Sequence, residues 1–358
     1  MKVIFSGGGT LGPVTPLLAI KDIIETTYKE ASFFWVGTRH GPEKMLVEKK
    51  GIPFQTISAG KFRRYKSFQN VLAPFRLSFG FLQSLIIMWK EKPDMCISVG
   101  GFVSVPLHAA AWLFGVKTWI HQQDVQVGLS NKLMAPIATI ITIALKAHTA
   151  SFPKRKTTWI GNPIRQDILT GDKEKARTLF HLKKEIPVVF VTGGGTGSQR
   201  VNQLVVEAVG DLEGICQVIH LSGKNRPQEL VNNAERHFDY YQVHQFFTNE
   251  MKEAYAIADI VISRGGFGTI AEVAALKKPT ILIPKPGHQE ENVQFLADQD
   301  AVILMNETTS DGHGLAKVIK ELLAHKKETK EMGERFSKVL PQAKEKEIIH
   351  VIKELYGT

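Results

Sequence analysis

Short apolar runs alternate with longer segments of helical periodicity along most of the 358-residue chain. Residues 1–5 predict a strand, residues 6–12 a glycine-rich turn, and residues 14–25 a helix. Pro13 and Pro16 fall at the start of this helix, where a missing N–H is tolerated. Such alternation is typical of a parallel sheet with helices on both faces.

The order of strand, glycine turn and helix occurs four times. In the first half, the turns follow strands expected at 1–5 and 95–99; in the second half, they follow strands expected at 188–192 and 260–263. This internal repeat predicts an α/β protein built from two Rossmann-like, doubly wound domains.

We place the first domain at 1–162 and the second at 163–340, because Gly161-Asn162-Pro163 is a turn sequence between apolar segments. Residues 341–358 contain a last helical pattern that could pack on either domain, and we expect it to return to the first. If the two sheets face each other, all four glycine turns border one cleft.

The amino-acid composition of the chain is typical of a folded protein with a buried core. Hydrophobic residues make up 43% of the chain and charged residues 22%, which excludes a mainly disordered protein. Cys96 and Cys216 each lie inside an apolar run. They predict buried, reduced thiols and exclude a disulfide framework or a cysteine zinc site.

Two segments bear on membrane and export signals. Met1-Lys2 runs directly into the first strand, without the pattern of a secretory signal. Residues 95–116 carry no charge and are long enough to suggest a membrane span. Gly100, Gly101 and Pro106 divide them into a strand and a helix, so we assign them to the core.

The net charge of +10 is unevenly distributed. Residues 1–162 hold 20 Lys and Arg against 8 Asp and Glu, or +12, whereas the remainder hold 25 against 27, or −2. The basic first half predicts an anionic partner, such as phosphates, acidic lipid headgroups or nucleic acid.

Glycine turns that open helices present backbone N–H groups and a positive dipole end, and so favour phosphates. Residues 7–12 match the dinucleotide fingerprint G-x-G-x-x-G, yet the next strand ends at 33–39 without the expected carboxylate. No P-loop lysine follows the glycine turn at 7–12 or the one at 193–197, which argues against nucleotide triphosphate hydrolysis. The plainer interpretation is that glycine closes tight bends.

Short motifs along nearly the whole chain resemble one family. They are residues 7–10 with Val14 and Pro16, then 93–104, 121–124, 128–132, 161–165, 258–266, 269–272 and 288–292. In this order they resemble the MurG family of bacterial UDP-N-acetylglucosamine transferases, GT-B enzymes of glycosyltransferase family 28. The resemblance implies two domains facing across a cleft and inverting transfer of N-acetylglucosamine to an undecaprenyl-pyrophosphoryl muramyl-peptide in peptidoglycan synthesis.

The resemblance further implies that the second domain binds the UDP-sugar. Glu272 would take the ribose hydroxyls, Gln289 the sugar hydroxyls and Arg165 the nucleotide. The other implied donor-site residues are Gly195, Thr196, Thr248, Gly266, Gly268 and Thr269. Alternatives stay open: Thr269-x-x-Glu272 could be a capping box, Gln289 an ordinary helix-start residue and Arg165 a solvated side chain.

The first domain would then bind the lipid-linked acceptor. The implied residues are Gly9, Thr10, Gly12, Gly101 and Asn131. Between Lys61 and Trp89, basic and aromatic residues precede a long apolar helical pattern. This pattern predicts peripheral contact with an anionic membrane surface. The resemblance implies that this contact is at the cytoplasmic face of the membrane. A buried helix beside a solvated loop is the plainer alternative, and we favour nucleic acid least.

The sequence departs from the family on the catalytic side. Pro13 stands where the family has a histidine, Phe102 where it has a tyrosine, and residues 121–124 read His-Gln-Gln-Asp instead of His-Glu-Gln-Asn. Inverting transfer needs a base near the attacking hydroxyl. Asp124 and His121 are the candidates for this base, and a third alternative is that neither residue serves. His121 could instead be a histidine that ends a buried strand and has only a structural role.

Other functions stay open at this point. The fold and donor could serve another acceptor, such as diacylglycerol or a different polyprenyl phosphate. Loss of the family histidine at Pro13 is compatible with a non-catalytic UDP-sugar-binding relative, and residues 7–12 with a nicotinamide oxidoreductase. No cluster with metal-ligand spacing is readable, and the resemblance implies neither an obligatory metal nor a further cofactor.

Overall fold

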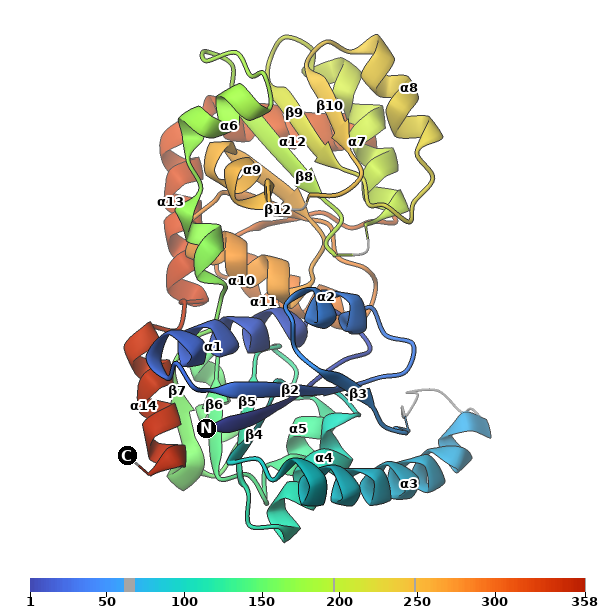
Figure 1. Ribbon diagram of the computed structural model, residues 1–358. Coiled ribbons are helices and arrows are strands. Elements are labelled where there is room, and N and C mark those ends of the chain that lie inside the picture. Colours follow the sequence, from blue (N-terminus) through green and yellow to red (C-terminus); the bar gives the residue numbers. More distant parts are fainter. Residues whose placement is uncertain (61–67, 196, 248, 358) are drawn as a thin grey trace. The chain divides into compact units, whose positions relative to one another are not determined.

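The computed structural model describes residues 1–60, 68–195, 197–247 and 249–357, with the backbone alone for 68–74. The chain divides into two compact domains. The first comprises Met1–Arg165 together with Gln342–Thr358, and the second comprises Gln166–Pro341. The boundary thus falls after Arg165, within a few residues of the expected turn (Figure 1).

The first domain is built on a sheet of seven parallel strands in the order β3-β2-β1-β4-β5-β6-β7. Their bounds are β1 Lys2–Ser6, β2 Ser32–Gly37, β3 Phe54–Thr56, β4 Met95–Ser98, β5 Lys117–Gln122, β6 Ile140–Ile143 and β7 Thr157–Trp159. The central strands are apolar and buried because helices cover both faces of a parallel sheet.

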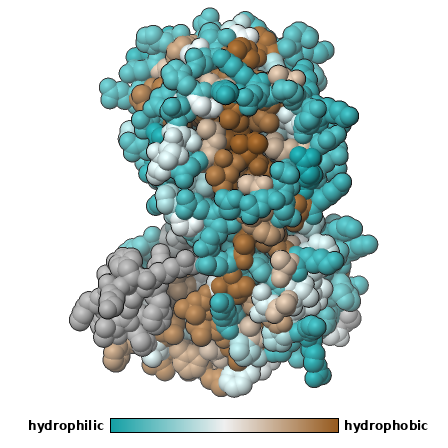
Figure 2. Space-filling view, turned by 180° about the vertical axis from the view of Figure 1, so that it is seen from behind, coloured by the Kyte–Doolittle hydropathy of each residue, from teal (hydrophilic) through white to brown (hydrophobic). Residues whose placement is uncertain are grey.

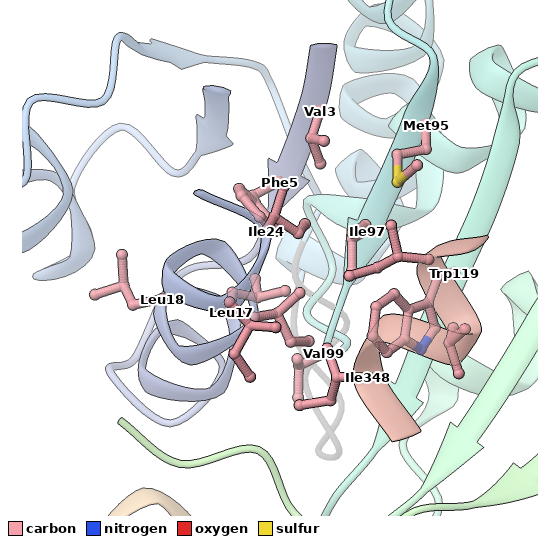
Figure 3. Close-up of a cluster of buried hydrophobic side chains, with 14 of the residues drawn as sticks. Val3, Phe5, Leu17, Leu18, Ile24, Met95, Ile97, Val99, Trp119 and Ile348 are labelled. Atoms are coloured by element: carbon pink, nitrogen blue, oxygen red, sulfur yellow. The ribbon is translucent and has the colours of Figure 1, made fainter. Parts of the chain in front are cut away.

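Helices cover this sheet on its two sides. They are α1 Val14–Thr27, α2 Glu43–Lys49, α3 Phe68–Glu91, α4 Ser104–Leu113, α5 Leu129–Met134 and α14 Glu345–Tyr356, with short 3-10 turns at Lys146–Ala150 and Lys154–Lys156. Figure 3 shows the core on one side, where Leu17 of α1, Trp119 of β5 and Ile348 of α14 meet. On the other side, α3 and α4 bury a second cluster around Ile4 and Leu107.

The second domain repeats this plan with six parallel strands in the order β10-β9-β8-β11-β12-β13. The strands are β8 Val188–Thr192, β9 Gln217–Leu221, β10 Tyr241–His244, β11 Ile260–Ser263, β12 Thr280–Leu282 and β13 Ile303–Leu304. The helices are α6 Lys173–Leu179, α7 Gln199–Leu212, α8 Glu229–His237, α9 Met251–Ile257, α10 Phe267–Ala275, α11 His288–Ala297, α12 Gly312–Ala324 and α13 Lys326–Val339, after a 3-10 turn at Gln166–Thr170.

The C-terminal segment returns to the first domain. Asn162 and Gln342 form a parallel bridge, and the backbone N–H of Ala343 donates to Asn162 O over 2.9 Å. Helix α14 packs on α1, where the rings of Tyr28 and Tyr356 lie 6.1 Å apart. The last helix therefore completes the core of the first domain.

Two expectations about buried segments are confirmed. Residues 95–116 form strand β4 and helix α4, and no helix in the described residues is long and apolar enough to cross a bilayer. Cys96 and Cys216 are free and buried. Burial raises the pKa of the Cys216 thiol to about 12, so the thiol is protonated and inert at neutral pH.

Candidate active site

The four glycine turns lie at equivalent places in the two domains. In each sheet, the strand order reverses beside the first strand, between β1 and β4 and between β8 and β11. The turns at 7–12 and 100–101 follow β1 and β4, and those at 193–197 and 265–266 follow β8 and β11. Ligands of doubly wound sheets bind outside the carboxyl ends of the strands at this reversal.

The first glycine turn is held by a buried carboxylate. Glu43, at the start of α2, is fully buried. Its carboxylate accepts hydrogen bonds from the backbone N–H of Gly9 over 3.2 Å and of Thr38 over 2.7 Å, and from the Thr38 hydroxyl. A Cβ on Gly8 would lie 2.1 Å from Glu43 Oε1, so only glycine fits there. Gly9 and Thr10 are exposed at the tip.

The second glycine turn packs against the first. Gly100 and Gly101 adopt φ of +93° and +98°, which L side chains rarely adopt. A Cβ on Gly101 would lie 3.6 Å from Gly8 O, and one on Gly9 would lie 3.2 Å from the Phe102 ring. The backbone N–H of Gly101 donates to Ser130 Oγ over 3.1 Å. The two turns therefore form one surface at the carboxyl ends of β1 and β4.

His121 lies inside the sheet. It is fully buried in β5, with Nδ1 2.8 Å from Thr142 Oγ1 and Nε2 3.3 Å from Asn162 Oδ1. Burial lowers the pKa of His121 to about 4, against a smaller opposing effect of the hydrogen bond to Asn162. Both ring nitrogens are occupied and the ring is neutral at physiological pH, as expected for a histidine that ends a buried strand.

An amide network shapes the loop after β5. The Gln122 amide donates to Asp124 O over 2.7 Å and to Gln126 O over 3.2 Å, and its oxygen accepts from Asn131 Nδ2 over 2.7 Å. His148 Nε2 donates to Val125 O over 2.7 Å. These bonds fix the backbone that carries the half-buried Asp124. Asp124 is thus more exposed than the fully buried His121.

In the second domain, one arginine joins the donor-side loops. Ser198 caps α7 through the backbone N–H of Val201, and Arg264 Nε donates to Ser198 Oγ over 2.7 Å. Arg264 Nη1 also donates to Ile283 O over 3.0 Å and pairs with Glu307. This side chain at the end of β11 therefore holds the turns after β8 and β12 in register.

The expected donor residues cluster around α10 and α11. Gly266 is the N-cap of α10, which contains Gly268, Thr269 and the buried Glu272. The capping-box alternative is wrong, because the helix begins at Phe267 and both Thr269 and Glu272 lie inside it.

Neighbouring turns complete this cluster. A Cβ on Gly194 would lie 3.9 Å from Thr269 Oγ1, and Gln289 at the start of α11 packs on Gly265. Gln289 Oε1 accepts from the backbone N–H of Lys285 over 3.0 Å. Gly195 is exposed in the turn after β8, and Arg165 is half-buried at the end of the first domain. Thr196 and Thr248 lie outside the described residues.

Two family models match the chain. The glycosyltransferase family 28 N-terminal domain matches residues 3–143, and the glycosyltransferase family 28 C-terminal domain matches residues 188–351. The chain belongs to glycosyltransferase family 28. The nicotinamide oxidoreductase interpretation of residues 7–12 is therefore not supported, since the matched family consists of glycosyltransferases.

Relatives in this family match most of the length of the chain. A UDP-N-acetylglucosamine–N-acetylmuramyl-(pentapeptide) pyrophosphoryl-undecaprenol N-acetylglucosamine transferase of Bacillus cereus is 33% identical, over 98% of this chain and 97% of its own. Transferases with the same descriptive name are 36% identical in Lachnospira eligens, over 89% and 86%, and 37% identical in Shouchella clausii, over 84% and 83%.

Solved structures share the fold. MurG of Acinetobacter baumannii superposes with a TM-score of 0.75 at 22% identity, over 100% of this chain and 99% of that chain. The UDP-GlcNAc 2-epimerase of Neisseria meningitidis superposes with a TM-score of 0.68 at 13% identity, over 99% and 100%. The two-domain Rossmann-like architecture expected from the repeat is confirmed.

Two residues that hold the glycine turns in place, Glu43 and Arg264, were missed from the sequence. Glu43 follows a proline in an ordinary helix-start pattern, so nothing local distinguishes it from a solvated carboxylate. Arg264 stood inside a quoted motif, but its bonds to Ser198 and Glu307 join segments far apart in the chain. Among the described residues, no group of three or more His, Cys, Asp or Glu is placed to hold a metal ion.

Proposed function

We propose that this family 28 member transfers N-acetylglucosamine from UDP-N-acetylglucosamine to an undecaprenyl-pyrophosphoryl-linked N-acetylmuramyl pentapeptide. The observation that carries the proposal is the 33% identity to the Bacillus cereus transferase of that name over 98% of the chain. The relatives agree on this acceptor, which favours it over diacylglycerol.

The second domain supplies the donor site in this proposal. The glycine turns after β8 and β11 lie at the reversal of the sheet, beside Arg264, and each leads into a helix, where a diphosphate would be favoured. Glu272 would accept the ribose hydroxyls and Gln289 would contact the sugar. Backbone and basic groups then stabilise the departing UDP, so transfer should proceed without an added divalent cation.

In this proposal the first domain binds the acceptor and supplies the catalytic base. The acceptor hydroxyl oxygen attacks the anomeric carbon, the bond to the UDP oxygen breaks, and the hydroxyl proton passes to the base. We assign the base to Asp124, since the loop after β5 is fixed by Gln122 and His148 whereas His121 is buried with both nitrogens occupied. Gly9, Thr10, Gly12, Gly101 and Asn131 would contact the acceptor.

The first domain also carries the membrane contact. Five large side chains on one face of α3 are between 56% and 73% exposed: Phe75, Phe79, Leu82, Ile86 and Trp89. Trp112, Leu113 and Phe114 are exposed at the end of the neighbouring α4. Figure 2 shows hydrophobic residues, in brown, gathered on one face of this domain.

We name the five α3 side chains and the three at the end of α4 the apolar patch. Exposed apolar side chains flanked by Arg76 and Lys90 suit the interface of an anionic bilayer. The basic residues expected to assist, from Lys61 to Lys66, lie outside the described residues. The lipid-linked acceptor would be reached at the cytoplasmic face.

The function is tested with radiolabelled UDP-N-acetylglucosamine and the undecaprenyl-linked muramyl-pentapeptide acceptor in detergent. The label should move into the lipid phase, with and without EDTA. Acceptors built on diacylglycerol or bare undecaprenyl phosphate should stay unlabelled. Saturable UDP binding without transfer to any lipid would instead identify a non-catalytic relative, and label on diacylglycerol would contradict the acceptor assignment.

A further inference from the structure

His121 lies at the centre of a chain of buried hydrogen bonds. On one side, Trp119 Nε1 donates to Thr142 Oγ1 over 2.7 Å, and this hydroxyl oxygen lies 2.8 Å from His121 Nδ1. On the other side, His121 Nε2 lies 3.3 Å from Asn162 Oδ1. All four residues are at most 2% exposed, so these bonds are shielded from water. The ring therefore links strand β5 to the segment that follows β7.

The neighbours of His121 determine which of its nitrogens carries the proton. Asn162 Nδ2 donates to Pro163 O over 3.3 Å, so exchanging the nitrogen and oxygen of this amide would place an oxygen against a carbonyl. Asn162 Oδ1 is therefore the acceptor and His121 Nε2 the donor. Because the buried ring is neutral, its Nδ1 has no proton and accepts from the Thr142 hydroxyl.

Asn162 stands where the chain passes between the two domains. Its backbone O accepts from Ala343 N over 2.9 Å, and it forms a parallel bridge with Gln342. The connections between the domains are Arg165–Gln166 and Pro341–Gln342. Asn162 is thus three residues from the first connection and bonded directly beside the second.

The loop after β5 is bonded to the other side of His121. Asn131 Nδ2 donates to His121 O over 3.2 Å and to Gln122 Oε1 over 2.7 Å. The Gln122 amide in turn donates to Asp124 O over 2.7 Å. Through these bonds, the place of the Asp124 backbone depends on the place of His121.

We infer that His121 is a positioning residue: through its bond to Asn162, it holds the loop that carries Asp124 in a fixed place relative to both connections between the domains. The inference rests on the proposed function, in which one domain binds the donor and the other the acceptor. The base and the bound donor must then be aligned, and a misplacement of about 1 Å can cost about 100-fold in rate. Breaking the link should therefore lower kcat, while each domain still binds its substrate.

Two amide substitutions of His121 separate its two side-chain bonds. In His121→Gln the amide reaches the place of Nε2 and can still donate to Asn162, whereas in His121→Asn it reaches only the place of Nδ1. With both substrates saturating, kcat should fall by about tenfold or more in His121→Asn and stay within about threefold of wild type in His121→Gln. The KM for UDP-N-acetylglucosamine should be unchanged in both variants.

Thr142→Val is the matched control, because it removes the hydroxyl at Nδ1 and keeps the bond at Nε2. It should lower the melting temperature and leave kcat within about threefold of wild type. Asn162→Ala should lower kcat as His121→Asn does, and the double variant should be no slower than either single variant.

Three results would overturn the inference. An unchanged kcat in His121→Asn would show a purely structural role. Equal losses of kcat in His121→Gln and His121→Asn would show that the bond to Asn162 is not the cause. Losses that add in the double variant would show that the two residues act independently.

Histidine NMR tests the link without a transfer assay. In protein labelled with nitrogen-15 in its histidines, His121 should give an Nε2–H signal that persists between about pH 6 and pH 8. This proton should exchange faster with water in Asn162→Ala. A proton on Nδ1 instead would overturn the inference. A wild-type protein that shows the Nε2–H signal yet transfers nothing contradicts the proposed function alone.

Discussion

The loop after β5 shows how neighbours decide what a side chain can do. His121 and Asp124 are three residues apart and both have groups that can take a proton. His121 is fully buried, and its low pKa of about 4 makes it a poor base at neutral pH. Asp124 lies two residues beyond the end of β5 and is half-buried. Gln122 can support this loop only as an amide, since a carboxylate could not donate to two backbone carbonyls.

Replacing Asp124 should therefore impair chemistry rather than folding. We expect Asp124→Asn to lower kcat by about 100-fold or more, with the UDP-N-acetylglucosamine KM and the melting temperature near wild-type values. Initial rates with both substrates saturating measure this effect. Asp239→Asn, at an exposed position in the second domain, is the matched control. A kcat within threefold of wild type would remove Asp124 as the base.

At the scale of elements, Arg264 links three loops by hydrogen bonds to Ser198, Ile283 and Glu307. A lysine cannot span the same partners, because it lacks the planar fork of donors. Arg264→Lys should raise the KM for UDP-N-acetylglucosamine by about tenfold and leave the acceptor KM unchanged. Arg335→Lys, which removes an exposed contact to Asp300 O, is the control. An effect on the acceptor KM alone would contradict this role.

Helix α3 exposes apolar side chains at spacings of four and three residues, from Phe75 to Trp89. This spacing also suits a two-helix seam between two copies of the chain. If the face meets a membrane, Phe79→Ser with Ile86→Ser should weaken binding to anionic phosphatidylglycerol vesicles by about tenfold or more, because less apolar area is buried.

Vesicle sedimentation measures this binding, and sedimentation velocity measures the size of the particle. Leu230→Ser with Phe246→Ser, two exposed apolar positions in the second domain, should bind like wild type. A dimer that dissociates in the α3 variant, with vesicle binding unchanged, would show that the face joins two chains instead.

The bounds of the strands and helices show how much of the fold the sequence could predict. Strands β8 and β11 have the predicted bounds, because each is a continuous apolar run that ends at a turn sequence or glycine. Helix bounds differed by a few residues; α1, for example, runs from Val14 to Thr27, two residues beyond its expected end at residue 25. The hydrogen-bond partners of Glu43 were beyond prediction, because they depend on which distant backbone atoms its side chain meets.

For the whole molecule, the repeat of strand and glycine turn was enough to predict two parallel-sheet domains. The repeat itself could not place the last helix, because an amphipathic helix fits any apolar groove of suitable size. Our expectation that this helix returns to the first domain is confirmed. The bridge between Asn162 and Gln342 brings the chain back to the first domain, and Ile348 then packs beside Trp119 (Figure 3). The first domain is thus made of two separate stretches of sequence and cannot be complete without the second stretch.

Buried histidines in both domains should make the folded protein sensitive to acid. Burial lowers the pKa of His108 and His220 to about 3 and that of His121 to about 4. Between pH 6.5 and these values, the unfolded chain binds protons that the folded chain does not. The free energy of unfolding should therefore fall by about 1.4 kcal/mol per pH unit for each such histidine as the pH is lowered.

His108 allows a clean test of this effect. Neither of its ring nitrogens has a hydrogen-bond partner in the described part of the chain, so His108→Leu removes a titrating group without breaking a bond. All five tryptophans lie in residues 1–165, so their fluorescence during urea unfolding reports on the first domain. Between pH 6 and 5, the variant should lose about 1.4 kcal/mol less than wild type, whereas the exposed control His40→Leu should follow wild type. Equal slopes for all three proteins would mean that His108 titrates alike in the folded and unfolded chain, and its burial would then have no effect on acid stability.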